Sequence, residues 1–313
     1  MNTGISRKET IISYVIAIVF ILAMVMTAVI LDDREVILPE VAAMAIAMWV
    51  YRDAGWIRQP LKIFIAPSIT ATIGYVVNQF PISYAGKVMI TLAIIMLLLR
   101  IIQSNLAPSI ATGLLPLVIN ATEWRFIIMV FILTFILMLG VQVFRLNKGL
   151  EKKVPIEYKY MLVFLFLNII WIGLVWSIGY TQLAVIPPIL VVVYEVLQKP
   201  MFSGKMAFKL GLLLNISAAV GTLLYVTIDS WILITIIAML LMLVLLRIFG
   251  MRLPAVYAFP LLTLVLPAEV VVMLPIGTLV ATVFFFGSVL VIKKWEMKRN
   301  NKKMKLVNKT NMI

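Results

Sequence analysis

Long apolar runs, separated by short polar or Pro/Gly-containing segments, cover almost the whole chain. A membrane-spanning helix needs about 20 predominantly apolar residues to cross the hydrocarbon core of a bilayer. We therefore expect an all-α, polytopic membrane helix bundle of about 12 transmembrane helices, the first of them a retained span rather than a cleaved signal. The predicted spans are 11–31, 36–51, 61–79, 85–102, 106–121, 125–144, 159–178, 183–198, 207–227, 230–248, 253–272 and 274–292.

The positions of the basic residues test this count, because cytoplasmic loops of membrane proteins carry an excess of Lys and Arg. With the N-terminus inside, alternation places every basic residue on the inner side except Arg34, Lys87 and Arg125. We therefore expect a multi-pass cell-membrane protein with both termini in the cytoplasm. Its basic tail should face anionic lipid headgroups rather than nucleic acid. The predicted outer loops are instead acidic, with Asp32, Asp33, Glu35, Glu123, Asp229 and Glu269.

The composition agrees with a membrane protein and excludes several kinds of catalytic and metal-binding site. Of the 313 residues, 64% are hydrophobic and 13% are charged, and the mean hydropathy is +1.12. Twelve spans with short loops leave no room for an extramembrane catalytic domain. The absence of Cys and His removes thiolate nucleophiles, imidazole bases and the usual zinc or haem ligands. We expect no metal, no cofactor, no catalytic residues and no enzymatic activity.

Four short proline-led segments recur along the chain, beginning at Pro39, Pro108, Pro187 and Pro254. Each is the middle of a three-span unit, and consecutive units with an odd number of spans must insert in opposite orientations. Inverted units nested within parallel halves are a common way to build secondary transporters, although proline also recurs simply because membrane helices tolerate it near their ends. The predicted parts are a first six-helix half at 1–150, a second at 151–297 and a basic tail at 298–313.

The stretch from Leu106 to Pro116, LAPSIATGLLP, resembles the signature of the HPP family of membrane proteins. In that family His-Pro-Pro opens a small-residue run that ends in Leu-Leu-Pro. Gln59-Pro60, followed by a span that ends in Ile73-Gly74-Tyr75, is also similar, so the resemblance covers roughly 36–140. It implies a transporter, with a small anion such as nitrite as one expected solute. The histidine position holds Leu106 and the first proline position holds Ala107, so no role of that histidine is carried over.

The spans that begin near Pro108 and Pro254 are the most interrupted, since Pro116, Pro260 and Pro267 follow within them. A proline removes an N–H and exposes a carbonyl, and the ends of broken helices can bind ions or anions. Equivalent breaks in the two halves favour a shared central site, although a simple kink packed by neighbours explains them equally well.

Polar side chains at membrane depth are few. Hydroxyl residues there usually serve helix packing, whereas a buried amide needs hydrogen-bond partners. Glu40 either caps a helix start or is a proton-coupling acid, and Glu195 either pairs with Lys199 or has such a role. The residues that we predict along a solute pathway are Glu40, Ser68, Thr72, Pro108, Ser109, Thr112, Asn168, Asn215, Pro254 and Pro260.

The leading hypothesis is a secondary transporter or permease of a small solute, with the lipid bilayer as its surroundings. The first alternative is a membrane-embedded enzyme of lipid or cell-wall precursor metabolism, although the outer loops lack the charged motifs that such enzymes use. The second is a non-transporting membrane subunit of an export or immunity complex, which copurification of an ATPase would reveal.

Overall fold

The computed structural model describes residues 7–151 and 156–310, with side chains as far as Arg299. The described residues form helices and connecting loops and contain no strand. The end of the predicted basic tail, 311–313, lies outside them. The elements are α1 (Arg7–Leu31), η1 (Arg34–Val36), α2 (Pro39–Ala45), η2 (Ile46–Val50), α3 (Ala54–Ile57), α4 (Pro60–Asn78), α5 (Tyr84–Ile101), α6 (Pro108–Val118), α7 (Trp124–Val143), α8 (Tyr158–Ser177), η3 (Thr181–Ala184), α9 (Pro187–Gln198), α10 (Gly204–Thr227), α11 (Trp231–Phe249), α12 (Ala255–Val265) and α13 (Ala268–Thr310).

Within the described part of the chain, 9 helical segments are long and apolar enough to cross a membrane. They are α1, α4, α5, α7, α8, the η3–α9 segment, α10, α11 and α13. The protein is therefore a polytopic helical membrane protein, as its hydropathy predicts. The helices α6 and α12 are apolar but shorter, and α2 is continued by a π-helical turn, η2.

The predicted spans 36–51 and 183–198 are not continuous helices. Leu38 and Ile186 have extended backbones, and helix begins only at the proline that follows each of them. The reason is steric, because the ring of a proline disfavours helical geometry at the residue before it.

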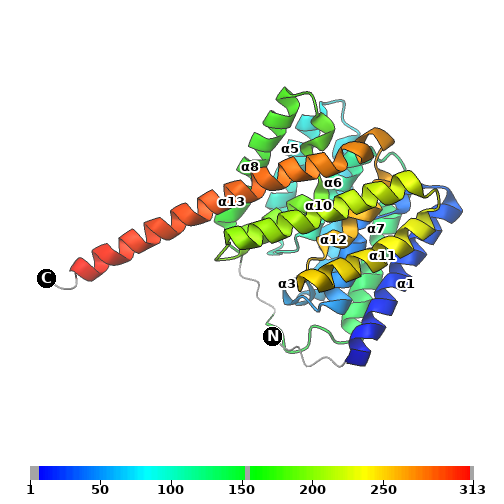
Figure 1. Ribbon diagram of the computed structural model, residues 1–313, viewed down its shortest axis with the longest axis horizontal. Coiled ribbons are helices and arrows are strands. Elements are labelled where there is room, and N and C mark those ends of the chain that lie inside the picture. Colours follow the sequence, from blue (N-terminus) through cyan, green and yellow to red (C-terminus); the bar gives the residue numbers. More distant parts are fainter. Residues whose placement is uncertain (1–6, 152–155, 311–313) are drawn as a thin grey trace.

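The predicted boundary between 253–272 and 274–292 is wrong for the same reason. Helix α12 ends at Val265, Leu266 is extended, and α13 begins directly after Pro267. Pro275, near the predicted boundary, lies inside α13. Helix α13 then continues past residue 292, so the described part of the tail is helical and projects beyond the bundle (Figure 1).

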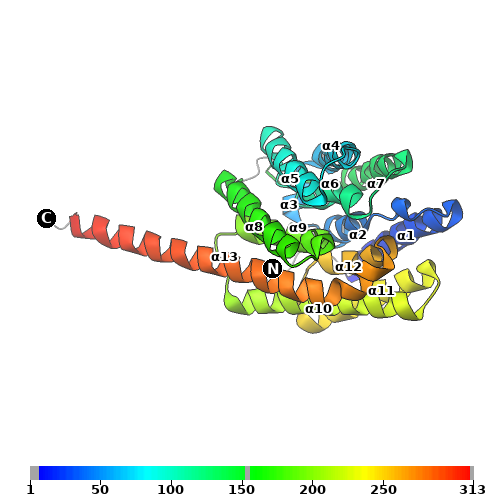
Figure 2. The same ribbon diagram turned by 90° about the horizontal axis from the view of Figure 1, so that it is seen from above.

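The long helices surround the short ones. Figure 2 shows α4, α5 and α7 on one side and α10, α11 and α13 on the other, with α2, α9 and α12 between them. Every residue of α2 and α12 is buried, and α6 is buried except at its last residue. Helix α4 packs closely on α6, and α10 packs closely on α12. The core of the molecule therefore consists of the proline-led helices.

Polar contacts gather at two ends of the bundle. Arg125 pairs with Asp33, and the amides of Thr122 and Glu123 donate to the Glu35 carboxylate, so residues predicted to be outer contact one another. Residues predicted to be inner do the same. Their contacts include the pairs Arg52–Glu9 and Lys159–Glu296 and the bond from Lys62 to the Gln103 carbonyl.

Candidate functional site

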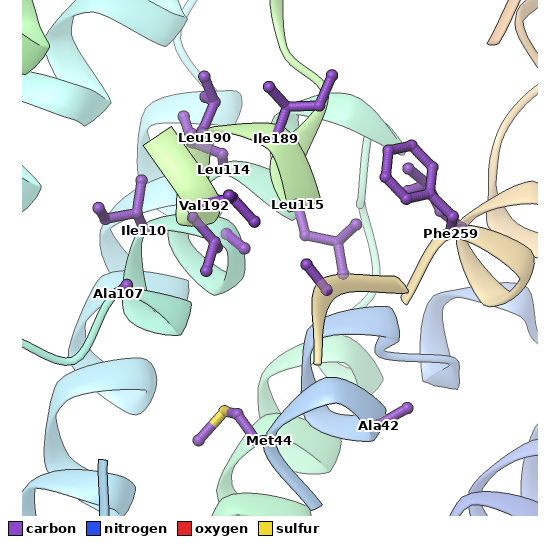
Figure 3. Packing of buried hydrophobic residues seen from close by; sticks show 14 of the residues in the cluster. Ala42, Met44, Ala107, Ile110, Leu114, Leu115, Ile189, Leu190, Val192 and Phe259 are labelled. Atoms are coloured by element: carbon purple, nitrogen blue, oxygen red, sulfur yellow. The ribbon is translucent and has the colours of Figure 1, made fainter. Parts of the chain in front are cut away.

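The four short helices meet around a small enclosed space, which we call the central cavity. Its volume is about 20 Å³, which is room for about one water molecule. Figure 3 shows buried apolar side chains of α2, α6, α9 and α12 in the core around these helices, among them Leu115 of the cavity lining. The cavity is lined by Pro39, Glu40, Ala43, Trp56, Pro108, Ala111, Leu115, Pro187, Pro188, Val191, Ala255, Ala258 and Leu262.

Each of the four helices begins at this cavity. Pro39, Pro108 and Pro187 occupy the first turns of α2, α6 and α9, and Pro254 is the N-cap of α12. Proline suits the first helical turn, because its φ angle is already helical and an N–H there would have no partner within the helix. The recurring prolines therefore position four helix starts around one point.

The cavity combines a positive potential with few hydrogen-bond donors. The N-termini of α6, α9 and α12 carry the positive ends of their helix dipoles. However, Pro108, Pro187 and Pro188 have no N–H. The amides of Ser109 and Ile189 donate to the carbonyls of Leu106 and Ile186 within the first turns. An occupant of the cavity would therefore find an attractive field for negative charge but little direct hydrogen bonding from these helices.

Glu40 brings a carboxyl group into this space. Its side chain is only 4% exposed, and its Oε1 atom has no hydrogen-bond partner. The hydroxyl of Thr112 and the amide of Glu40 itself face the carboxyl group, while the Thr112 hydroxyl also donates to the carbonyl of Pro108 at 3.0 Å. A buried polar atom without a partner is costly, so this oxygen makes Glu40 a candidate site residue.

Trp56 connects the cavity to a second carboxyl group. The Trp56 side chain lines the cavity from α3, and its Nε1 donates to Oε1 of Glu195 at 2.8 Å. Glu195 lies on α9, so the bond joins two segments far apart in the sequence. The pair of Glu195 and Lys199 considered from the sequence is not among the ion pairs of the described residues. We call the bond between Trp56 and Glu195 the inner contact.

A larger hollow, which we call the outer vestibule because its polar lining lies in or near loops predicted to be outer, lies towards the opposite ends of α6 and α12. Its volume is about 400 Å³. It is lined by Leu117 and Leu266, whereas the central cavity is lined by Leu115 and Leu262 of the same helices. At a rise of about 1.5 Å per residue, these lining residues are about 3 Å apart along α6 and about 6 Å apart along α12 and its C-cap, so about half a turn to one turn separates the two spaces. The polar lining of the outer vestibule consists of Asn78, Tyr84, Lys87, Asn120, Thr181 and Gln182.

The structure brings together some of the residues predicted along a solute pathway. Glu40 and Pro108 line the central cavity and Thr112 faces Glu40, while Pro254 caps the helix whose first residue, Ala255, lines it. Ser109 lies in the first turn of α6, buried and without a partner for its hydroxyl.

The remaining predicted residues lie elsewhere. Ser68 and Thr72 line a separate groove beside Phe131. Asn215 donates to the carbonyl of Gly211 and to the Thr282 hydroxyl. Asn168 donates to the Phe164 carbonyl of its own helix, and Pro260 packs against Gly221.

Sequence reasoning did not single out Trp56, Pro188 or the alanines of the cavity wall. The doubled proline at 187 and 188 was a usable signal, because it removes two successive donors from a helix start. Trp56 lies in a predicted inner loop, and nothing local indicated that its indole would reach a cavity.

Comparisons with protein-family models, with curated proteins and with solved structures find no match for this chain. Within the described residues there is no group of 3 or more His, Cys, Asp or Glu side chains that could hold a metal ion.

Proposed function

We propose that this protein is a secondary transporter of a small solute and that the central cavity is its binding site. One observation carries the proposal: four short helices begin around a single enclosed cavity that holds one buried carboxyl group with an unpartnered oxygen. Helix starts placed at mid-bundle are costly unless they line a cavity, and transporters use them to bind solutes near the bilayer midplane.

The helix packing supports an arrangement of twelve crossings in two equivalent halves. The contacts of α4 with α6 and α7 have counterparts in those of α10 with α12 and α13, and α1 with α11 corresponds to α8 with α5. The close glycine contacts follow the same rule, since Gly74 meets Gly113 of α6 and Gly221 meets Pro260 of α12. Four three-helix units, starting at α1, α5, α8 and α11, account for this pattern.

The two hollows and the inner contact support a working cycle. The outer vestibule lies at the C-terminal ends of α6 and α12, away from the helix starts that line the central cavity. The bond between Trp56 and Glu195 closes the other end between α3 and α9. Rocking of one half against the other would break that bond and open the cavity towards the inner end. In this proposal the inner end is cytoplasmic, as the basic residues predict.

Flux through the purified protein in liposomes tests the proposal. The full chain is reconstituted, and exchange of labelled solute is measured with nitrite, nitrate, lactate and several neutral solutes such as amino acids and sugars. We expect saturable exchange of at least one of them above the rate of protein-free liposomes. Replacing the cavity alanine in Ala111→Trp should abolish it, because the indole fills a space of about 20 Å³.

The matched control is Ala85→Trp, which adds the same side chain at a half-buried position on α5 away from the cavity lining. It should retain exchange. An absence of exchange for every solute in the wild type would overturn the proposal, as would full activity of Ala111→Trp.

The resemblance to the HPP family stays a prediction and is the reason for including nitrite among the solutes. A membrane-embedded enzyme stays the main alternative, and conversion of a lipid-linked precursor by the purified protein would favour it.

A further inference from the structure

Glu40 is the one charged side chain among the residues that line the central cavity. Its neighbours on every packed element are uncharged or already engaged. Helix α6 presents the Thr112 hydroxyl, α9 and α12 present prolines and aliphatic side chains, and α3 presents Trp56, whose N–H is bound to Glu195. Helices α1 and α7 also pack on α2, and within the described residues they bring no charged group against the Glu40 carboxyl.

The electrostatic potential in the cavity favours one negative charge. The positive ends of α6, α9 and α12 favour such a charge. In its ionised form, Glu40 supplies this charge itself. A carboxylate and a solute anion enclosed together would repel each other strongly, because like charges in a poorly solvated site cannot both be accommodated. An anion can therefore occupy this cavity only when Glu40 carries a proton.

The scarcity of donors leads to the same conclusion. An enclosed anion needs hydrogen bonds to replace its hydration, and the prolines at the helix starts supply none. A protonated carboxyl group gives one O–H donor. Because Oε1 of Glu40 has no partner in the chain, that O–H would be directed to whatever occupies the cavity. The proton on Glu40 would thus both remove the repulsion and hold the anion.

The outer vestibule is suited to a negatively charged solute. Lys87 is the one charged residue among those that line it. Its Nζ is held at 2.6 Å from the carbonyl of Asn78, so the charge has a fixed position. A basic group in a concave surface raises the local concentration of anions.

We propose that Glu40 is the proton-binding site of an electroneutral symport, in which one proton and one monovalent anion bind together at the central cavity after it has widened from its present volume of about 20 Å³. This deepens the transport function proposed above and rests on it. The proton binds Oε1 of Glu40 from the outer vestibule, and the anion then enters and accepts a hydrogen bond from the new O–H group. Release of both at the inner end leaves Glu40 ionised again, so that charge and protons balance over the cycle.

The test uses the full chain in liposomes that contain a trapped pH-sensitive dye. An inward gradient of nitrite, nitrate or lactate is imposed with equal pH on both sides. We expect the interior to acidify as the transported anion enters, at least tenfold faster than in protein-free liposomes. Clamping the membrane potential with valinomycin and equal potassium should leave the rate unchanged.

Glu40→Gln separates coupling from transport. Its amide keeps a donor in the cavity but cannot exchange a proton, so acidification should be lost. Exchange of labelled anion at equal concentrations on both sides should be slower than in the wild type, because Glu40 itself contacts the anion, but still measurable. The control Glu269→Gln removes an exposed carboxyl group at the outer end of α13 and should behave as the wild type. Exchange that persists in Glu40→Gln also shows that the variant folds.

The possible failures are distinguishable. Anion exchange without acidification, acidification by Glu40→Gln at the wild-type rate, or a rate that follows the membrane potential would overturn the symport alone. Exchange of neutral solutes only would also overturn it and leave the transport function standing. Absence of any exchange by the wild type would overturn both.

Discussion

At the scale of single residues, two wholly or partly buried carboxyl groups differ in what surrounds them. Glu40 and Glu195 both lie within proline-led segments, but one faces an empty space and the other accepts a bond from Trp56. The sequence placed both carboxyl groups inside predicted spans. It could not distinguish them, because the partner of Glu195 is 139 positions away in the chain. Only the folded arrangement separates an engaged carboxyl group from an unengaged one.

The inner contact should contribute measurably to stability. Trp56→Phe removes the donor and leaves the partly buried Glu195 carboxyl without it, so we expect a loss of about 1–2 kcal/mol, measured as a lower midpoint of thermal unfolding in detergent. Trp176→Phe, at a position that is 67% exposed, is the control and should change little. In a Glu195→Met background Trp56→Phe should cost clearly less. Equal cost in both backgrounds would contradict a direct bond.

Glu35, in the predicted outer loop before α2, should make stability depend on pH. Burial raises its pKa above the ordinary value of 4.5, helped by Asp33 and the side chain of Glu123, and opposed by the amides of Thr122 and Glu123. Since the folded state then binds the proton more tightly than the unfolded state, this contribution is complete below 4.5 and is lost as pH rises through the folded pKa.

The measurement is the unfolding midpoint of wild type and Glu35→Gln across this pH range. As pH falls towards 4.5, the wild type should gain stability relative to the variant. Glu269→Gln, which replaces an exposed carboxyl group, is the control and should show no such relative change. A wild type that loses stability relative to Glu35→Gln on acidification would show that the amide bonds outweigh burial.

At the scale of elements, the hydropathy pattern predicted the long helices well and the short ones incompletely. The predicted spans 61–79 and 125–144 lie within one residue of α4 and α7 at each end. In contrast, α6 and α12 are shorter than their predicted spans. An apolar run reports that a segment is in lipid or in a core, not whether its backbone is helical throughout. The positions of the prolines indicate where the helices break. The predicted span 253–272 ran through Pro267, although the break between α12 and α13 lies there.

Close contact between helices explains the glycines of the long elements. A Cβ added at Gly74 would lie 1.9 Å from the carbonyl oxygen of Gly113, and one at Gly221 would lie 2.8 Å from Cα of Pro260. Both obstacles are backbone atoms, so the helices must move apart. Gly74→Ala should therefore destabilise the protein by about 1–3 kcal/mol, measured by thermal unfolding, and Gly221→Ala by somewhat less.

Gly173 of α8 is the matched control for these two substitutions. An added Cβ there meets nothing within 4 Å, and alanine is a better helix former than glycine by up to about 1 kcal/mol. Gly173→Ala should therefore be neutral or stabilising. If it cost as much as Gly74→Ala, general loss of flexibility rather than close packing would explain all three.

At the scale of the whole molecule, the number of crossings decides how the cavity is reached. Nine described segments satisfy length and hydropathy on their own, and α2, α6 and α12 do not. Helices α2, α6 and α12 could each cross together with the extended segment that precedes it. In that case both termini lie on one side of the membrane, and the outer vestibule faces the opposite side. If they do not cross, the loops between α2 and α6, and those after α12, lie on the opposite side from the one they have with twelve crossings. Each polar end of the bundle would then contain residues from both sides of the membrane.

Labelling of single cysteines distinguishes these arrangements, because the chain has no cysteine of its own. With twelve crossings, Gln79→Cys should react with a membrane-impermeant maleimide on intact cells, and Lys298→Cys only in inverted vesicles. With nine, the two should exchange behaviour. Asp229→Cys outside and Lys205→Cys inside are expected in both cases and serve as controls. The contact of Tyr75 with the Thr122 carbonyl supports a crossing by α6. It holds the end of α4 beside the start of α7, and these two ends lie on one side of the membrane only if α6 crosses between them.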